Sequence, residues 1–177
     1  MEFRILKQNE IHLLKQIDRS EKLDGIYYFE GKNLKLREID YYMQGFPEGE
    51  LEELLERLEV LHNNGGAIFA AFDGEKIAGM TAVENTMRGN EKDTMKMDIL
   101  FVSKPYRGRG LGADLIALVK EEIVKRGGKK MYVSSTESKN TVDFYISQGC
   151  RLATELEIDP ELYEMEPEDI HLILELE

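Results

Sequence analysis

A run of closely spaced glycines between a strand-like and a helix-like stretch constrains this fold more than any other feature of the sequence. The strand is predicted over residues 95–102, because the stretch is short, ends in Ile-Leu-Phe-Val and is stopped by Pro105. Residues 106–112 follow as Tyr-Arg-Gly-Arg-Gly-Leu-Gly. A helix is predicted from there to Gly127, since apolar residues recur at helical spacing: Leu111, Leu115, Leu118, Val119 and Ile123.

The glycine-rich turn predicts a site for a phosphate or diphosphate. Glycines at the start of a helix leave N–H groups that have neither intrahelical partners nor side chains covering them, so an anion can approach the main chain closely. Arg107 and Arg109 would add charged donors at the edge of such a site. The alternative is a tight turn with two solvated arginines.

Two other phosphate-binding turns do not fit. A Walker loop needs Gly-Lys followed by Ser or Thr, which this turn lacks. Gly108, Gly110 and Ala113 match the loose dinucleotide fingerprint, but that fingerprint opens the first βαβ unit of a doubly wound sheet. Here it follows residue 100 of 177, too late for the remaining strands and helices of a Rossmann domain.

The same residues carry a resemblance when they are taken with the stretch that follows the helix. Leu-Phe-Val at 100–102, Arg107-x-x-Gly110-x-Gly112, then Asn-Thr-Val-Asp-Phe-Tyr at 140–145 and Gly149 resemble the GNAT superfamily of N-acetyltransferases. The resemblance covers residues 95–152. It implies an α/β (α+β) fold, a mixed central β-sheet flanked by helices with a splayed pair of parallel strands. We expect a single GNAT acetyltransferase domain over residues 1–177, with acetyl-CoA as cosubstrate.

Length, composition and charge agree with one globular domain. Apolar residues make up 42% and charged residues 33%. No apolar run is long enough to cross a bilayer, the start lacks a signal-peptide pattern, and the single Cys150 cannot form an intrachain disulfide. We therefore expect a cytoplasmic protein. The net charge of −12 disfavours nucleic acid and anionic membranes and favours cationic or amine-bearing partners.

Hydrophobic patterning predicts most of the other elements. Strands are expected at 3–6, 67–72, 77–83, 131–134, 151–155 and 170–176, and helices after Asn9, at 50–62 and at 141–148. Residues 131–134 should lie parallel to 95–102 because a helix of crossover length joins them. The pattern leaves residues 24–47 undetermined. The resulting order is β-α-α-β-β-β-α-β-α-β-β.

The resemblance implies which residues meet acetyl-CoA. The main chain of Leu100, Phe101 and Val102 would pair with the pantetheine arm, while their side chains belong to the core. The diphosphate would lie on the turn formed by Arg107, Gly108, Arg109, Gly110, Leu111 and Gly112. Ser138 and Asn140 stand near the position where relatives often carry a cofactor-contacting asparagine. Both can instead cap the following helix.

Two residues are the catalytic candidates. Tyr145 stands where the family places the acid that protonates the leaving thiolate, although a tyrosine on an amphipathic helix can also serve packing alone. Asp98 stands where many relatives carry a glutamate that accepts the amine proton. Strand alternation should put Asp98 on the face of Leu100 and Val102, and its shorter side chain favours a water relay. A solvated carboxylate is the alternative, and Glu137 is a second candidate for the base.

Other reactive side chains have structural explanations. Cys150 is expected to be a small buried apolar residue, because direct transfer needs no covalent intermediate. His12, His62 and His171 show no ligand spacing, so no metal site is predicted. The aromatic residues within 24–47 could form the acceptor pocket or pack in the core.

The prediction is an enzyme that moves an acetyl group from acetyl-CoA to a primary amine of a small molecule. Two alternatives stay open: acetylation of a peptide α-amine or lysine, and a CoA-binding regulatory module that has lost catalysis. A small-molecule amine is the expected partner, with no nucleic acid and no membrane. A homodimer is also left open.

Overall fold

The computed structural model describes residues 1–176 of the chain. Its strands are β1 (Glu2–Ile5), β2 (Glu21–Glu30), β3 (Asn33–Met43), β4 (Ala67–Asp73), β5 (Lys76–Val83), β6 (Thr94–Val102), β7 (Lys130–Ser135), β8 (Arg151–Leu152) and β9 (Ile170–Glu175). Its α-helices are α1 (Glu50–Asn63), α2 (Leu111–Lys125), α3 (Lys139–Ser147) and α4 (Pro160–Met165), and its 3-10 helices are η1 (Gln8–Gln16) and η2 (Lys104–Tyr106).

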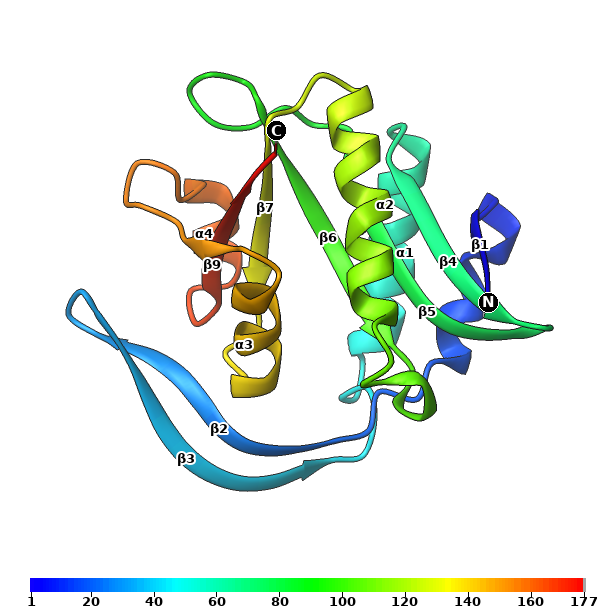
Figure 1. Cartoon of the computed structure of the whole chain (residues 1–177), viewed down its shortest axis with the longest axis horizontal. Coiled ribbons are helices and arrows are strands. Elements are labelled where there is room, and N and C mark those ends of the chain that lie inside the picture. The colour runs from blue at the N-terminus through cyan, green and yellow to red at the C-terminus, as the bar shows by residue number, and fades with distance from the viewer. Residues whose placement is uncertain (177) are drawn as a thin grey trace.

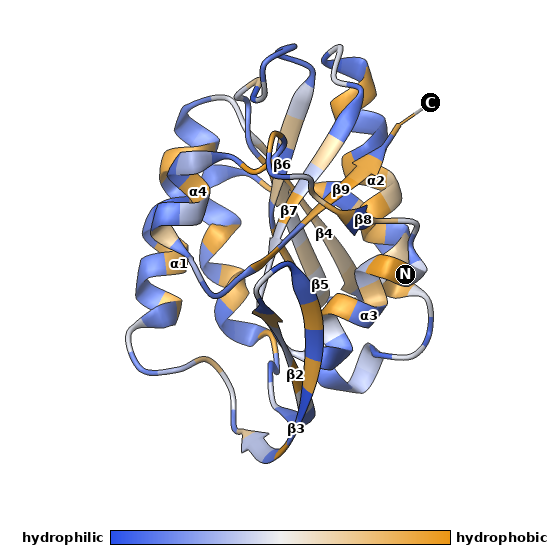
Figure 2. Ribbon diagram, turned by 90° about the vertical axis from the view of Figure 1, so that its left-hand side faces the viewer, coloured by the Kyte–Doolittle hydropathy of each residue, from blue (hydrophilic) through white to orange (hydrophobic). Residues whose placement is uncertain are grey.

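Seven strands form one mixed sheet in the order β1-β4-β5-β6-β7-β9-β8, with β6 and β7 as its parallel pair (Figure 1). Figure 2 shows α1 and α4 on one face of this sheet and α2 and α3 on the other. The predicted fold class is therefore confirmed. No helix within residues 1–176 combines the length and the apolar character that crossing a membrane requires.

Each face of the sheet has its own buried layer. Met95, Met97 and Val133 belong to the layer that includes residues of α2 and α3. Ile99 and Met80 belong to the layer that includes residues of α1 and η1. Because the central strands β5 and β6 are covered on both faces, their sequences read as nearly continuous apolar runs rather than strict alternations.

The parallel pair separates soon after it begins. β6 and β7 are paired only from Thr94 opposite Lys130 to Lys96 opposite Tyr132. Beyond these residues, β6 remains paired with β5, and β7 remains paired with β9. The two strands thus diverge toward their carboxyl ends. We call the opening between them the β6–β7 gap. The splayed pair that the resemblance implied is present.

The undetermined segment 24–47 forms most of a long antiparallel ribbon, β2 with β3, that is separate from the main sheet (Figure 1). Its turn is the dipeptide Gly31-Lys32, with Glu30 opposite Asn33 and Gly31 at φ 62°. A positive φ at the first turn position is typical of two-residue hairpins and favours glycine. The predicted element order lacked these two strands.

Three further predictions need correction. The helix expected after Asn9 is the 3-10 helix η1, which fits the spacing of three between Ile11 and Leu14, both buried. The strand expected at 151–155 is only β8, because the chain turns at Thr154, whose N–H donates to Glu157 Oε2 at 2.9 Å. Helix α4 was missed, although Asp159 caps its first turn and Pro160 opens it, a recognisable start signal.

Candidate active site

The glycine-rich turn leads into α2 with its main-chain donors uncovered. Gly108 and Gly110 have φ values of 72° and 84°, and a Cβ atom at either would meet no atom within 4 Å. Glycine is therefore needed here for backbone conformation rather than for space. Helix bonding begins with Asp114 N–H to Gly110 O at 3.1 Å. Within residues 1–176, no N–H of residues 108–113 donates a hydrogen bond, so the turn fits an anion.

The two arginines of the turn have different surroundings. The guanidinium of Arg107 donates to three carbonyl oxygens: Val102 at 2.8 Å, Ser20 at 3.0 Å and Asp18 at 3.3 Å. Its side chain thus fastens the turn to the end of β6 and to the start of β2. Arg109 is exposed beside the turn and is the arginine whose charge can act on a bound anion.

Gly112 sets how closely the start of α2 approaches α3. A Cβ atom on Gly112 would lie 2.9 Å from Cζ of Phe144, too close unless the ring shifted. The ring of Phe144 therefore packs directly on the main chain of α2. This contact joins the glycine-rich turn to the helix that carries Tyr145.

Strand β2 spans the wide end of the β6–β7 gap (Figure 1). Its start is held by Arg107 beyond the end of β6, and its middle by the N–H of Tyr27, which donates to Glu137 O beyond the end of β7 at 2.7 Å. The predicted residues Ser138 and Asn140 lie at this second attachment. Ser138 Oγ caps α3 through Thr141, and Asn140 Nδ2 donates to Glu21 Oε1 at 3.0 Å.

A cavity of about 690 Å³ opens on the face of the sheet that carries α1 and α4. It reaches the gap, because Leu100 and Phe101 of β6, Ser134 of β7 and Tyr145 of α3 all line it. Its charged lining residues are seven carboxylates and four cationic side chains: Glu50, Glu53, Glu84, Asp98, Glu161, Glu166, Asp169, Arg19, Arg57, Arg88 and Lys96. Negatively charged side chains thus outnumber positively charged ones in the lining of the cavity.

Tyr145 is buried, with 6% of its surface exposed, yet it lines the cavity. Its hydroxyl makes no hydrogen bond to any other group within residues 1–176. Burial, with a smaller contribution from Cys150, raises the pKa of Tyr145 above its ordinary value. The phenol therefore stays protonated and can donate to a group that enters the cavity.

Asp98 lies in a β-bulge, where the register between β5 and β6 shifts. Its side chain is 2% exposed and pairs with Lys96 Nζ at 2.7 Å and Arg57 Nε at 2.9 Å. Burial alone would raise the pKa of Asp98, but the charges and hydrogen bonds of Lys96 and Arg57 outweigh it and lower the pKa. The carboxylate is consequently a weak proton acceptor.

The bulge also corrects the predicted face of Asp98. Its partner Arg57 belongs to α1, whereas Leu100 and Val102 pack in the cluster of Leu111 and Leu115 from α2. The extra residue of a bulge breaks the alternation on which the prediction relied. Nothing in the local sequence marks this bulge.

Sequence reasoning overlooked Asp169, which lies between α4 and β9. Its Oδ2 accepts a hydrogen bond from Ser134 Oγ at 2.8 Å, and both residues line the cavity. Burial, together with Glu166 and Glu137, raises the pKa of Asp169. Only the pairing of β9 with β7 brings this aspartate to the gap, so no local motif could have indicated it.

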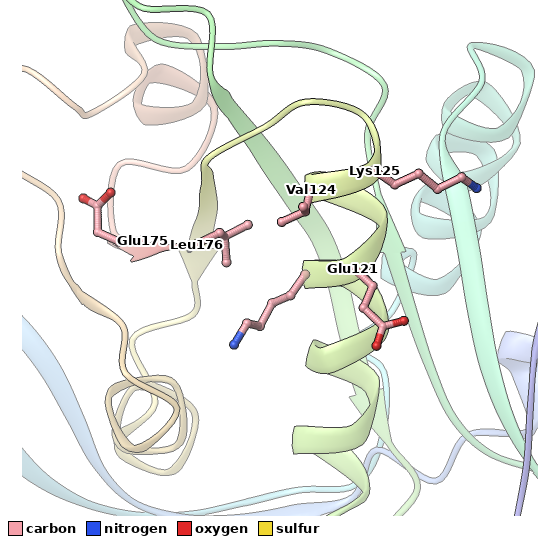
Figure 3. A pocket seen from close by; sticks show the side chains of 6 residues that line it. Glu121, Val124, Lys125, Glu175 and Leu176 are labelled. Atoms are coloured by element: carbon pink, nitrogen blue, oxygen red, sulfur yellow. The ribbon is translucent and has the colours of Figure 1, made fainter.

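A second hollow, of about 620 Å³, lies between the carboxyl half of α2 and the end of β9 (Figure 3). It is lined by Lys120, Glu121, Val124, Lys125, Glu175 and Leu176. None of these belongs to the glycine-rich turn or to the β6–β7 gap. Cys150 is 5% exposed, and burial raises the pKa of its thiol to about 11, so it is a neutral core residue as predicted.

The fold thus combines three features: a glycine-rich turn with free N–H groups at the start of α2, a splayed parallel pair, and a cavity that reaches the gap between its strands. The family model described as "Acetyltransferase (GNAT) domain" matches residues 42–157. The chain belongs to the GNAT family and is an acetyl-CoA-dependent acetyltransferase, as the sequence predicted.

Solved structures agree with this fold. A nourseothricin acetyltransferase superposes with a TM-score of 0.72 at 17% identity, over 99% of this chain and 98% of that one. A proposed streptothricin acetyltransferase from Bacillus anthracis, in complex with acetyl coenzyme A, gives the same four values. An aminoglycoside 6'-acetyltransferase type Ii gives a TM-score of 0.64 at 17% identity, over 99% and 97%. No curated protein matches the chain.

Proposed function

We propose that the chain transfers the acetyl group of acetyl-CoA directly to a primary amine of a small, positively charged molecule. The observation that carries this proposal is the cavity beside the β6–β7 gap. Its volume of about 690 Å³ lies within the usual range for small-molecule sites, and its carboxylates outnumber its cationic side chains. Nourseothricin and aminoglycosides, the compounds in the names of two structural neighbours, agree with a small-molecule acceptor.

The cosubstrate would lie along the gap. The free N–H groups of residues 108–112 would bind the diphosphate, with Arg109 at its edge. The β6 edge from Leu100 to Val102, which β7 leaves unpaired, would offer main-chain groups to the pantetheine arm. Since the side chains of Ser138 and Asn140 are already bound to Thr141 and β2, these two residues would act mainly by holding α3 in position.

Tyr145 would serve the departing sulfur. When the amine nitrogen bonds to the thioester carbon and the C–S bond breaks, negative charge develops on the sulfur. The phenol of Tyr145 is protonated, lines the cavity and has no other hydrogen-bond partner within residues 1–176. It can therefore donate to the sulfur as the charge appears.

Asp98 has a different role in this proposal from the base that the sequence suggested. Its ion pairs with Lys96 and Arg57 stabilise the ionised carboxylate, so Asp98 has little tendency to accept a proton. We assign it to positioning those two cations in the cavity wall. Glu137, the other candidate, has a carbonyl that binds the ribbon, which fixes its main chain at the wide end of the gap.

An amine panel tests the proposed function. The purified chain is incubated with acetyl-CoA and, in parallel, with polyamines, aminoglycosides, amino acids and lysine-containing peptides, and free thiol is followed over time. We expect the highest kcat/KM for small acceptors with two or more amino groups, because the cavity attracts positive charge. Raising the salt from 0.05 to about 0.5 M should lower kcat/KM for these acceptors more than for uncharged amines.

The other results of this panel separate the alternatives. Acetylation of peptides alone would contradict the small-molecule acceptor and favour a peptide α-amine or lysine. Binding of acetyl-CoA without thiol release from any acceptor would favour the regulatory module. The first result would replace the proposed acceptor class, and the second would replace the proposed transfer reaction.

A further inference from the structure

One carboxylate in the cavity differs from all the others. Four of the seven form ion pairs with arginine or lysine: Glu50, Glu84, Asp98 and Glu161. Two more, Glu53 and Glu166, are exposed to water. Asp169 alone is partly buried and, within residues 1–176, has no ion pair with a cation. Its hydrogen-bond partner is the hydroxyl of Ser134.

Asp169 also lies at the gap itself. At their gap end, β7 and β9 pair Ser134 with His171 and Ser135 with Ile170. Asp169 directly precedes β9, so it lies beside the end of β7 that has separated from β6. The cavity brings Asp169, Ser134 and Tyr145 to one space. An acceptor amine that reaches the gap from the α1 and α4 face would therefore enter a space that both Asp169 and Tyr145 line.

We infer that Asp169, oriented by Ser134, is the proton acceptor for the acceptor amine. This inference rests on the proposed function. The charged groups that face Asp169 are Glu166 beyond α4, Glu137 before α3 and Lys96 on β6. Burial, followed by the two glutamates, raises the pKa of Asp169, while the Ser134 hydroxyl and Lys96 lower it. Asp169 is thus a stronger base than Asp98, whose pKa is lowered.

The proton balance of the reaction closes with these two residues. An ammonium acceptor gives one proton to the Asp169 carboxylate, and its nitrogen lone pair then forms the C–N bond at the thioester carbon. The C–S bond breaks with its electron pair on sulfur, which takes a proton from Tyr145. The tyrosinate regains a proton from the newly bonded nitrogen. Asp169 releases its proton to water, so one proton leaves per turnover.

The test is the pH profile of Asp169→Asn with an acceptor found by the amine panel. Wild-type kcat/KM should reach a plateau between the pKa values of Asp169 and the amine. The kcat/KM of the variant should be about 100-fold lower near neutral pH. This factor lies at the lower end of the range for general bases, because solvent can supply part of the free amine. The rate of the variant should rise steadily with pH toward the amine pKa, so the deficit shrinks in alkaline buffer.

Two controls separate catalysis from structure. Glu168→Gln removes the same charge from the exposed neighbouring residue and should leave the profile unchanged. Ser134→Ala removes a hydrogen bond that lowers the pKa of Asp169, so the acid limb should move to higher pH. The melting temperature of Asp169→Asn should not fall, because a desolvated carboxylate without a cation destabilises the fold when it is ionised.

The possible outcomes distinguish failure of the Asp169 inference from failure of the proposed function. A wild type that is active while Asp169→Asn keeps its rate and pH profile overturns the inference alone. Loss of the plateau in Asp98→Asn instead of Asp169→Asn would return the base to Asp98. A wild type that acetylates no amine would contradict the proposed function, and the inference would fail with it.

Discussion

Tyr145→Phe is expected to lower kcat by about 1,000-fold while the dissociation constant of acetyl-CoA changes less than about threefold. A factor of this size lies in the middle of the range for general acids. The change removes one oxygen atom whose role begins only when charge develops on the sulfur, so ground-state binding should be kept. Steady-state kinetics and calorimetric titration of the same preparation measure the two quantities.

The structure allows a sharp control for this variant. Because the Tyr145 hydroxyl has no hydrogen-bond partner within residues 1–176, phenylalanine leaves no other buried group unsatisfied. The melting temperature should therefore stay close to that of the wild type. Unchanged kcat would remove Tyr145 from the chemistry, and a fall in kcat matched by a large fall in stability would assign it to packing instead.

Gly110→Asp is expected to weaken acetyl-CoA binding by about 30-fold relative to Gly110→Asn. Both side chains tolerate the left-handed conformation that Gly110 adopts at φ 84°, so the strain is matched. They differ in one negative charge beside the proposed diphosphate. Repulsion of about 2 kcal/mol, half the surface value for unit charges 4 Å apart, corresponds to that factor.

The comparison with asparagine also guards against misfolding. Aspartate at a helix N-terminus interacts favourably with the helix dipole, so Gly110→Asp should be no less stable than Gly110→Asn. High salt should narrow the difference in affinity. Equal dissociation constants for the two variants would mean that no anionic group lies near the start of α2.

The glycine-rich turn and its two flanking elements could be predicted because the signals there are local. Glycine spacing, the stop at Pro105 and the helical period of α2 act within a few residues of one another. The family resemblance then supplied the splayed pair, and it made Tyr145 a candidate whose role stays a prediction. The ribbon β2–β3 could not be read in the same way, since its strands bury little surface and carry no clear alternation.

The charged part of the site depended on tertiary structure. Asp98 sits in a bulge and is paired with Arg57, forty-one residues away in sequence. Asp169 reaches the gap only because β9 pairs with β7. The side chain of Arg107, expected near an anion, binds three carbonyl oxygens instead. Such pairings follow from the fold as a whole, so sequence spacing could not reveal them.

The proposed binding of acetyl-CoA depends on exposed main-chain N–H groups at the start of α2, which would bind its diphosphate. The decisive measurement is calorimetric titration of the wild type with acetyl-CoA and with S-acetylpantetheine, which has the thioester arm but lacks the diphosphate and the adenosine phosphate attached to it. We predict a clear heat of binding for acetyl-CoA and an affinity for S-acetylpantetheine about 100-fold weaker, as expected from the loss of one or two charge-assisted hydrogen bonds. Equal affinities, or no heat with acetyl-CoA, would mean that these N–H groups do not bind the diphosphate.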